Sequence, residues 1–361
     1  MADVLYAPVL KGRQGELAAL SMIQPVTRRH ALPVLEIMPP ADEVYAAAAL
    51  RRCGAAALRS AIERTATKLK VWAGQRLLLD AGLLTTEVEL RDGVGAVGFS
   101  VAAAADHGVE VTPIVRLNDG PLARRDAATW HADTRRGIAV RLSAEELDED
   151  AQDIDEALTE LLQGLGVDRR DADLVLDLGP VAGDLMVRAH SRLAADVLRE
   201  LSGAQEWREV IVSSGAFPAD LSAYPAWVLG EPPRYDAALY DQLRQRRRVP
   251  RQPVFSDYAV THPILAGIAH RPSPQLRYTV ADRWLVLKGR LNDPQSHAQF
   301  YDVCETIASH ADFVGAALGR ADARIANSRG GGPGNASTWR EVGTTHHLDY
   351  VVQRITTLGE P

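Results

Sequence analysis

Charged residues follow short apolar runs along this chain, and their types point to chemistry on an anion. Lysine and arginine bind phosphate and carboxylate groups, whereas carboxylates bind divalent cations or transfer protons. The cations are Lys11, Arg116 and Arg141, and the carboxylates are Glu36, Asp80, Asp177 and Asp257. Together they predict a site for a small anionic ligand, either with Mg2+ or Mn2+ held by the carboxylates or without a metal.

The alternative is that these groups pair with one another in a buried network of salt bridges. Desolvating so many charges at one end of a protein is costly. The set as a whole therefore favours a functional site, although any single residue in it could be structural.

Three further positions extend the candidate site. Ser213 and Ser214 follow an apolar run and precede a glycine, which suits a phosphate held by backbone N–H groups. Lys288 lies in a segment that repeats the five residues from Val9 to Arg13, by coincidence or because both lysines face the same anion. His346 is the candidate acid or base of an adjacent histidine pair, whose members point in different directions on a helix.

The spacing of the apolar runs predicts how these residues are positioned. Each run is short and rich in Val, Leu and Ile, as in parallel strands buried on both faces. The runs are Val4–Leu10, Leu32–Leu35, Leu77–Leu79, Val111–Val115, Ile138–Val140, Leu174–Leu176, Val210–Val212 and Val254–Phe255. Eight such runs, each separated by room for a helix, predict an α/β fold of the (β/α)8 TIM-like barrel type, whose strand ends meet at one mouth. A doubly wound open sheet is the alternative, and it too binds ligands at the strand ends.

The barrel pattern stops near residue 260, which predicts a barrel over residues 1–260 and a C-terminal extension over residues 261–361. Within the extension, Arg277–Val280 and Trp284–Leu287 flank a short polar turn and predict a hairpin. His297–His310 and Thr345–Leu358 predict helices, the second of which closes the fold. An extension that follows the eighth strand begins at the mouth, so we expect it to cap the pocket.

The composition limits the partners of the protein. A net charge of −7 argues against broad binding of nucleic acid, and no stretch approaches the ~20 apolar residues of a membrane span. The N-terminus has no basic segment before an apolar one, so no signal peptide is expected. Cys53 and Cys304 form no CxxC pair, which suits buried thiols in a reducing compartment. We expect a cytoplasmic protein.

The N-terminal segment from Tyr6 to Leu20, with its Lys-Gly-Arg-Gln-Gly-Glu block, resembles the start of the phage-type Beta protein family. Leu32–Ile37 is similar to the second strand of that family, and Trp339 followed by the histidine pair resembles its ending. The resemblance implies a role in a phage or mobile-element context, such as bacterial antiviral defence. It marks Lys11, Gly12, Glu16, Glu36 and His346 or His347 as family positions. Thr345 departs from the pattern, which has Asn before the histidine pair.

Three functions fit these observations. The first is an enzyme acting on a phosphorylated or nucleotide-like substrate, as a metal-assisted, phosphodiester-type hydrolase or as a lyase. The second is a non-catalytic sensor that recognises a nucleotide or a partner protein through the same mouth. The third is an interaction protein of a phage or defence system whose barrel has lost any chemistry.

Overall fold

Eight parallel strands form a barrel in the order in which they occur along the chain. The structure, a computed structural model, describes residues 3–40, 54–84, 86–264 and 273–361. The strands β1 to β8 are Val9–Lys11, Val34–Glu36, Arg76–Asp80, Glu110–Val115, Ile138–Ser143, Ala172–Pro180, Val210–Gly215 and Val254–Asp257. The barrel closes where Tyr6, just before β1, pairs with Phe255 of β8. The predicted (β/α)8 barrel is therefore confirmed, and the open-sheet alternative is wrong.

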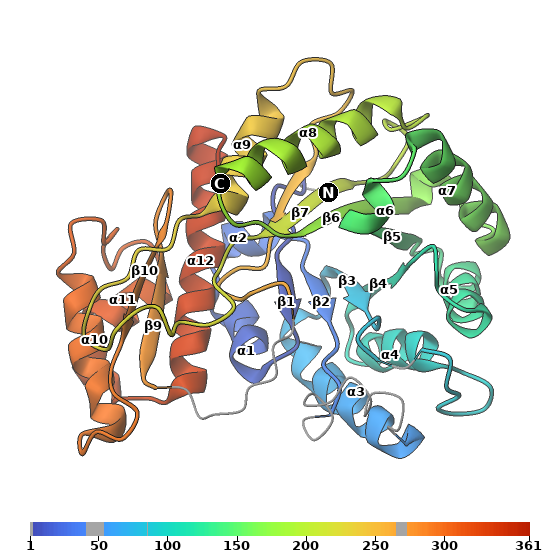
Figure 1. Cartoon of the computed structure of the whole chain (residues 1–361). Coiled ribbons are helices and arrows are strands. Elements are labelled where there is room, and N and C mark those ends of the chain that lie inside the picture. Colours follow the sequence, from blue (N-terminus) through green and yellow to red (C-terminus); the bar gives the residue numbers. More distant parts are fainter. Residues whose placement is uncertain (1–2, 41–53, 85, 265–272) are drawn as a thin grey trace.

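Helices connect consecutive strands and surround the barrel (Figure 1). They are α1 (Gln14–Met22), α2 (Pro25–His30), α3 (Ala55–Leu69), α4 (Ala96–Ala105), α5 (Pro121–Thr134), α6 (Ala144–Leu147), α7 (Ala151–Leu165), α8 (Asp184–Glu200) and α9 (Tyr235–Arg244). Helix α7 illustrates why these helices pack on the barrel. Its apolar residues recur every three or four positions and are buried, so they form one face that packs against the barrel. Gly166 then ends α7 in the left-handed conformation that glycine adopts readily. Among the described residues, no helix is long and apolar enough to cross a membrane.

The C-terminal extension is a hairpin with helices, as the sequence predicts. Strands β9 (Gln275–Thr279) and β10 (Trp284–Lys288) pair antiparallel and are followed by α10 (Gln299–Ala308), α11 (Arg320–Ala326) and α12 (Ala336–Leu358). Figure 1 shows the hairpin, α10 and α11 on one side of the molecule, with α12 between them and the barrel. Cys304 is buried on α10, and Cys53 lies outside the described residues.

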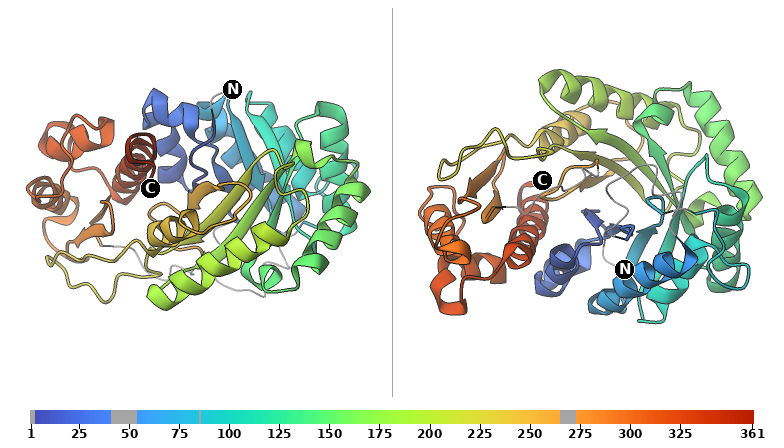
Figure 2. Two further views of the ribbon diagram at one scale, coloured as in Figure 1. Left: turned by 90° about the horizontal axis from the view of Figure 1, so that it is seen from above. Right: turned by 60° about the horizontal axis from the view of Figure 1, so that its bottom comes forward.

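Helix α12 belongs to the ring of helices as much as to the extension. Leu348, Val351 and Val352 join the large apolar core that lies between the strands and the outer helices, and α12 packs against α1 (Figure 2). It thus takes the position of the outer helix that would follow β8. The boundary at residue 260 stays a prediction, because the two segments share this core.

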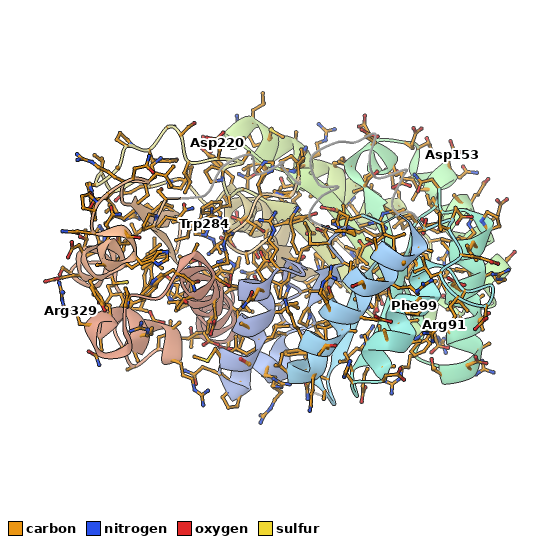
Figure 3. The ribbon with its side chains drawn as sticks, turned by 90° about the horizontal axis from the view of Figure 1, so that it is seen from below. Arg91, Phe99, Asp153, Asp220, Trp284 and Arg329 are labelled. Carbon is orange, nitrogen blue, oxygen red and sulfur yellow. The ribbon has the colours of Figure 1, made fainter. Side chains whose placement is uncertain are left out.

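The first residues of the extension lie at the mouth of the barrel. Lys11, at the end of β1, donates a hydrogen bond to the carbonyl of Pro263. Gly215, at the end of β7, lies so close to Pro263 that a Cβ there would be 2.4 Å from the proline ring. Residues 261–263 therefore bridge two strand ends on the mouth side. Figure 3 labels Trp284 and Arg329 in the extension, with Arg91 and Phe99 toward the opposite side of the barrel.

Candidate active site

Strand alternation decides which of the predicted residues face the barrel interior. The interior is filled by an apolar cluster that includes Val9, Val34, Leu78, Ile114, Ala139 and Val175. Side chains two residues further along each strand point to the same side. Lys11, Glu36, Asp80, Arg116, Arg141 and Asp177 therefore gather at the C-terminal end of the interior, and we call them the lumen cluster.

Arg141 lies at the centre of the lumen cluster. Its Nη1 is 3.0 Å from Glu36 Oε1 and 2.5 Å from Asp80 Oδ2, and its Nη2 is 2.6 Å from Asp177 Oδ2. The same Nη2 donates to the hydroxyl of Tyr258, which in turn donates to Asp177 at 2.7 Å. Because all three carboxylates converge on one guanidinium, Arg141 holds the strand ends of β2, β3 and β6 together.

The two terminal nitrogens of Arg116 donate hydrogen bonds to the carboxylate oxygens of Asp80, at 2.9 and 2.6 Å. The backbone N–H of Gly82 also donates to Asp80. Burial alone would raise the pKa of Asp80, but the two arginines beside it outweigh that effect and hold the pKa well below its usual range. The side chain of Arg116 is 26% exposed, against 6% for Arg141, so Arg116 marks the open end of the cluster.

Glu36 is held less firmly than Asp80. Its Oε2 atom is buried without a hydrogen-bond partner among the described residues, and the ammonium of Lys11 lies 3.8 Å away. Burial raises the pKa of Glu36, and Arg141 and Lys11 offset this only in part. Burial likewise lowers the pKa of Lys11. Burial therefore shifts the pKa values of these two partners toward each other.

Two serines add hydroxyl groups to the interior. Ser213 and Ser256 point inward, because they alternate with interior residues of β7 and β8. The Oγ atoms of both are buried without a partner in the described part of the chain. Ser214 has the opposite parity and faces the outer helices, so it does not share the interior with Ser213. The predictions missed Ser256 and Tyr258, which two-residue spacing from Val254 could have identified.

Asp257 corrects the prediction that all four carboxylates share the mouth. It points outward between β8 and α12, where it accepts a 2.5 Å hydrogen bond from Tyr6. His347 Nε2 lies 2.9 Å from Asp257, and Arg234 lies 3.5 Å away. All of these side chains are buried. Asp257 therefore joins the barrel to α12 rather than to the lumen cluster.

His346 and Lys288 also lie away from the lumen cluster. His346 is fully buried between β9, α11 and α12, with Nε2 2.8 Å from the carbonyl of Thr279 and Nδ1 3.0 Å from Asp322. Lys288, at the end of β10, donates to the carbonyl of Leu221. The prediction that His346 reaches the mouth as an acid or base is thus not supported by its position. The expected divergence of the two adjacent histidines is observed.

The lumen carboxylates do not fit a divalent cation. Among the described residues, no group of three or more His, Cys, Asp or Glu side chains could hold a metal ion. The guanidinium of Arg141 occupies the point at which Glu36, Asp80 and Asp177 converge, and it supplies the positive charge that a metal would bring.

The sequence model of one protein family, described as Beta protein, matches residues 6–353. The chain belongs to the Beta protein family. Among solved structures it is similar to a mutant tryptophan synthase alpha-subunit from the hyperthermophile Pyrococcus furiosus, with 12% identity and a TM-score of 0.37. That match covers 70% of this chain and 85% of the other. No match was found among curated proteins.

The predicted Beta protein family is thus confirmed, and its N-terminal pattern has a clear place in the structure. Lys11 and Glu36 face each other across β1 and β2. Gly12 allows the chain to pass close to β2, because a Cβ there would lie 3.1 Å from the carbonyl oxygen of Glu36. Glu16 is buried in the first turn of α1, beside Lys11. The Beta protein pattern therefore surrounds one side of the mouth.

Proposed function

We propose that the protein binds a small phosphorylated or nucleotide-like ligand at the C-terminal end of the barrel interior. The observation that supports this most is the group of buried polar atoms without a partner among the described residues: Glu36 Oε2, Ser213 Oγ and Ser256 Oγ. Each such atom costs about 1–3 kcal/mol. A ligand with hydroxyl or amide groups would satisfy them, which suits a sugar or a nucleobase.

The anionic part of the ligand would bind the two cations with donors to spare. Arg116 directs two of its five N–H groups to Asp80, and its exposed edge lies at the open end. Lys11 donates to one carbonyl, and its ion pair with Glu36 is long. A phosphate can therefore bind both without breaking the ion pair between Arg116 and Asp80.

Glu36 would carry the chemistry if the protein is an enzyme. A carboxyl group whose pKa is raised by burial is suited to give a proton to a leaving oxygen and to take one back. Asp80 is less suited to this role, because Arg116 and Arg141 hold its pKa well below its usual range. This supports a hydrolase of the phosphodiester type, or a lyase, that works through Glu36 without a metal.

A non-catalytic sensor is the second candidate, because one observation favours it. Arg141 makes hydrogen bonds to three carboxylates and a tyrosine, so most of the charge in the lumen cluster is neutralised internally. Such a site would recognise a nucleotide or a partner protein without reaction. We also propose that such a sensor would act in a phage or antiviral-defence system.

The test is calorimetric titration of the protein with nucleotides and sugar phosphates, followed by activity assays on any ligand that binds. Arg116→Ala should weaken binding at least tenfold, whereas Arg192→Ala, an exposed arginine on α8, should not change it. Glu36→Gln should bind the ligand and lose turnover if the protein is an enzyme. Absence of turnover in the wild type with a bound ligand favours the sensor. Equal affinity in the wild type and Arg116→Ala would refute the proposed site.

A further inference from the structure

Three arginines from separate elements meet beside the N-terminal end of α1. Arg13 precedes α1, Arg277 lies on β9 and Arg340 lies on α12. The backbones pack closely there, because a Cβ on Gly15 would lie 2.9 Å from the Cβ of Arg340, and one on Gly343 would lie 2.8 Å from the carbonyl of Arg277. We call this place the arginine seam.

The arginine seam has too little negative charge for its cations. Among the described residues, none of its three arginines forms an ion pair within 4.0 Å, and the side chains of Arg13 and Arg340 donate no hydrogen bond there. Glu16 is the carboxylate that faces them, and its Oε2 atom is buried without a partner in the described chain. Within the described parts of the chain, Arg277 donates only to the carbonyl of Val260, and its guanidinium lies over the ring of Phe217.

The shortage of counter-charge is costly because Arg13, Arg277 and Arg340 are only partly exposed to water. Burial lowers the pKa of Arg277 well below its usual range, Arg340 and Arg13 lower it further, and Glu16 opposes them. Burial also lowers the pKa of Arg340. Arginine nevertheless stays protonated in proteins, so losing a proton does not relieve the repulsion. A bound anion would.

We propose that the arginine seam binds a phosphate or pyrophosphate group, held by the guanidiniums of Arg13, Arg277 and Arg340. The planar guanidinium of arginine forms bidentate hydrogen bonds with oxyanions. The N-terminal end of α1 adds the positive end of a helix dipole. Lys11 is close enough to interact with Arg13 and Glu16 as well as with Glu36, so the seam adjoins the lumen cluster. The inference rests on the proposed function in one respect: the remainder of the ligand, including a second phosphate group at Lys11 and Arg116, would extend into the barrel interior.

The experiment measures binding of inorganic pyrophosphate by calorimetry, together with the unfolding midpoint in its absence. Arg340→Gln keeps the Cβ and Cγ that pack on Gly15 and removes only the charge. We expect it to weaken pyrophosphate binding at least tenfold while raising or preserving the midpoint, since repulsion is relieved. Arg354→Gln, on the same helix but paired with Glu360, is the control, and it should lower the midpoint slightly and leave binding unchanged.

The combination of results separates a ligand site from a structural one. If Arg340→Gln lowers the midpoint and leaves the pyrophosphate affinity unchanged, the arginines are structural and the inference is wrong. Arg13→Gln provides a second variant, in case Arg340→Gln does not fold, and it should also weaken pyrophosphate binding at least tenfold. If Arg116→Ala abolishes nucleotide binding while both seam variants bind pyrophosphate and nucleotide normally, the proposed function stands and the seam fails.

Discussion

Asp349 on α12 should make the protein less stable as pH rises through weakly acidic values. Its Oδ1 atom accepts hydrogen bonds from the backbone N–H of Gln24 at 2.9 Å and from the hydroxyl of Thr27 at 2.6 Å. Its Oδ2 atom has no partner among the described residues, and the residue is 3% exposed. Burial raises the pKa of Asp349 from 3.8 to about 6, although both hydrogen bonds oppose the change.

The raised pKa sets the sign and the size of the effect. Between about pH 4 and pH 6 the folded protein holds a proton on Asp349 that the unfolded chain has lost, so the free energy of unfolding falls as pH rises. The whole change corresponds to about 3 kcal/mol, at about 1.36 kcal/mol per pKa unit. Of this, about 1.4 kcal/mol falls between about pH 5 and about pH 7.5.

Asp349→Asn removes the titration and keeps the Oδ1 acceptor. We therefore expect the variant to gain about 1.4 kcal/mol on the wild type between about pH 5 and about pH 7.5, which is about 2 °C in midpoint for a chain of 361 residues. Any cost of burying the new amide is the same at both pH values and cancels in the comparison. Scanning calorimetry of the variant and the wild type at the two pH values measures this difference in unfolding midpoint.

The control is Asp133→Asn, which removes an exposed carboxylate on α5 and should show no such pH dependence. Equal differences between Asp349→Asn and the wild type at both pH values would refute the reasoning, because the buried carboxyl would then not titrate in this range.

Three other substitutions test the lumen and its supports. Arg141→Met leaves three lumen carboxylates without their shared partner and should cost about 3–5 kcal/mol of stability, measured by urea unfolding; a loss below about 1 kcal/mol would contradict the network. Asp257→Leu leaves the buried side chains of Tyr6 and His347 without their hydrogen-bond partner. It should lower the thermal midpoint without changing ligand affinity. Gly82→Ala places a Cβ 2.2 Å from the Arg116 guanidinium, so it should weaken ligand binding in calorimetry while the circular dichroism spectrum is preserved.

The barrel and most of its inward charges could be predicted because parallel strands leave a simple pattern. Each strand contains a short apolar run, and in six of them the first charged residue after the run is two positions beyond an interior residue. The rule fails at β8, where Val254 faces inward and Phe255 outward. Ser256 then takes the interior position, and Asp257 falls on the other face. A step of one residue exchanges the two faces of a strand, so residue type alone misplaced Asp257.

The C-terminal part was harder to predict because its contacts are long-range. The sequence indicated a closing helix from Thr345, but α12 begins at Ala336, where Asn335 caps its first turn. Glycine inside a helix usually weakens it, and Gly343 obscured the pattern. Its place is explained only by the backbone of β9, which packs against it. No local signal in the chain reports such a neighbour.

Helix α12 shows why residues far beyond the eighth strand matter for the mouth. It carries Arg340 toward the N-terminal end of α1, His347 toward Asp257 at the end of β8, and Asp349 toward the start of α2. A helix rises about 1.5 Å per residue, so a shift of α12 by a single residue along its axis would disturb all three contacts at once. The β1–α1 connection and the end of β8 are therefore positioned by the same helix, and an anion bound at the arginine seam would stabilise that arrangement by mass action.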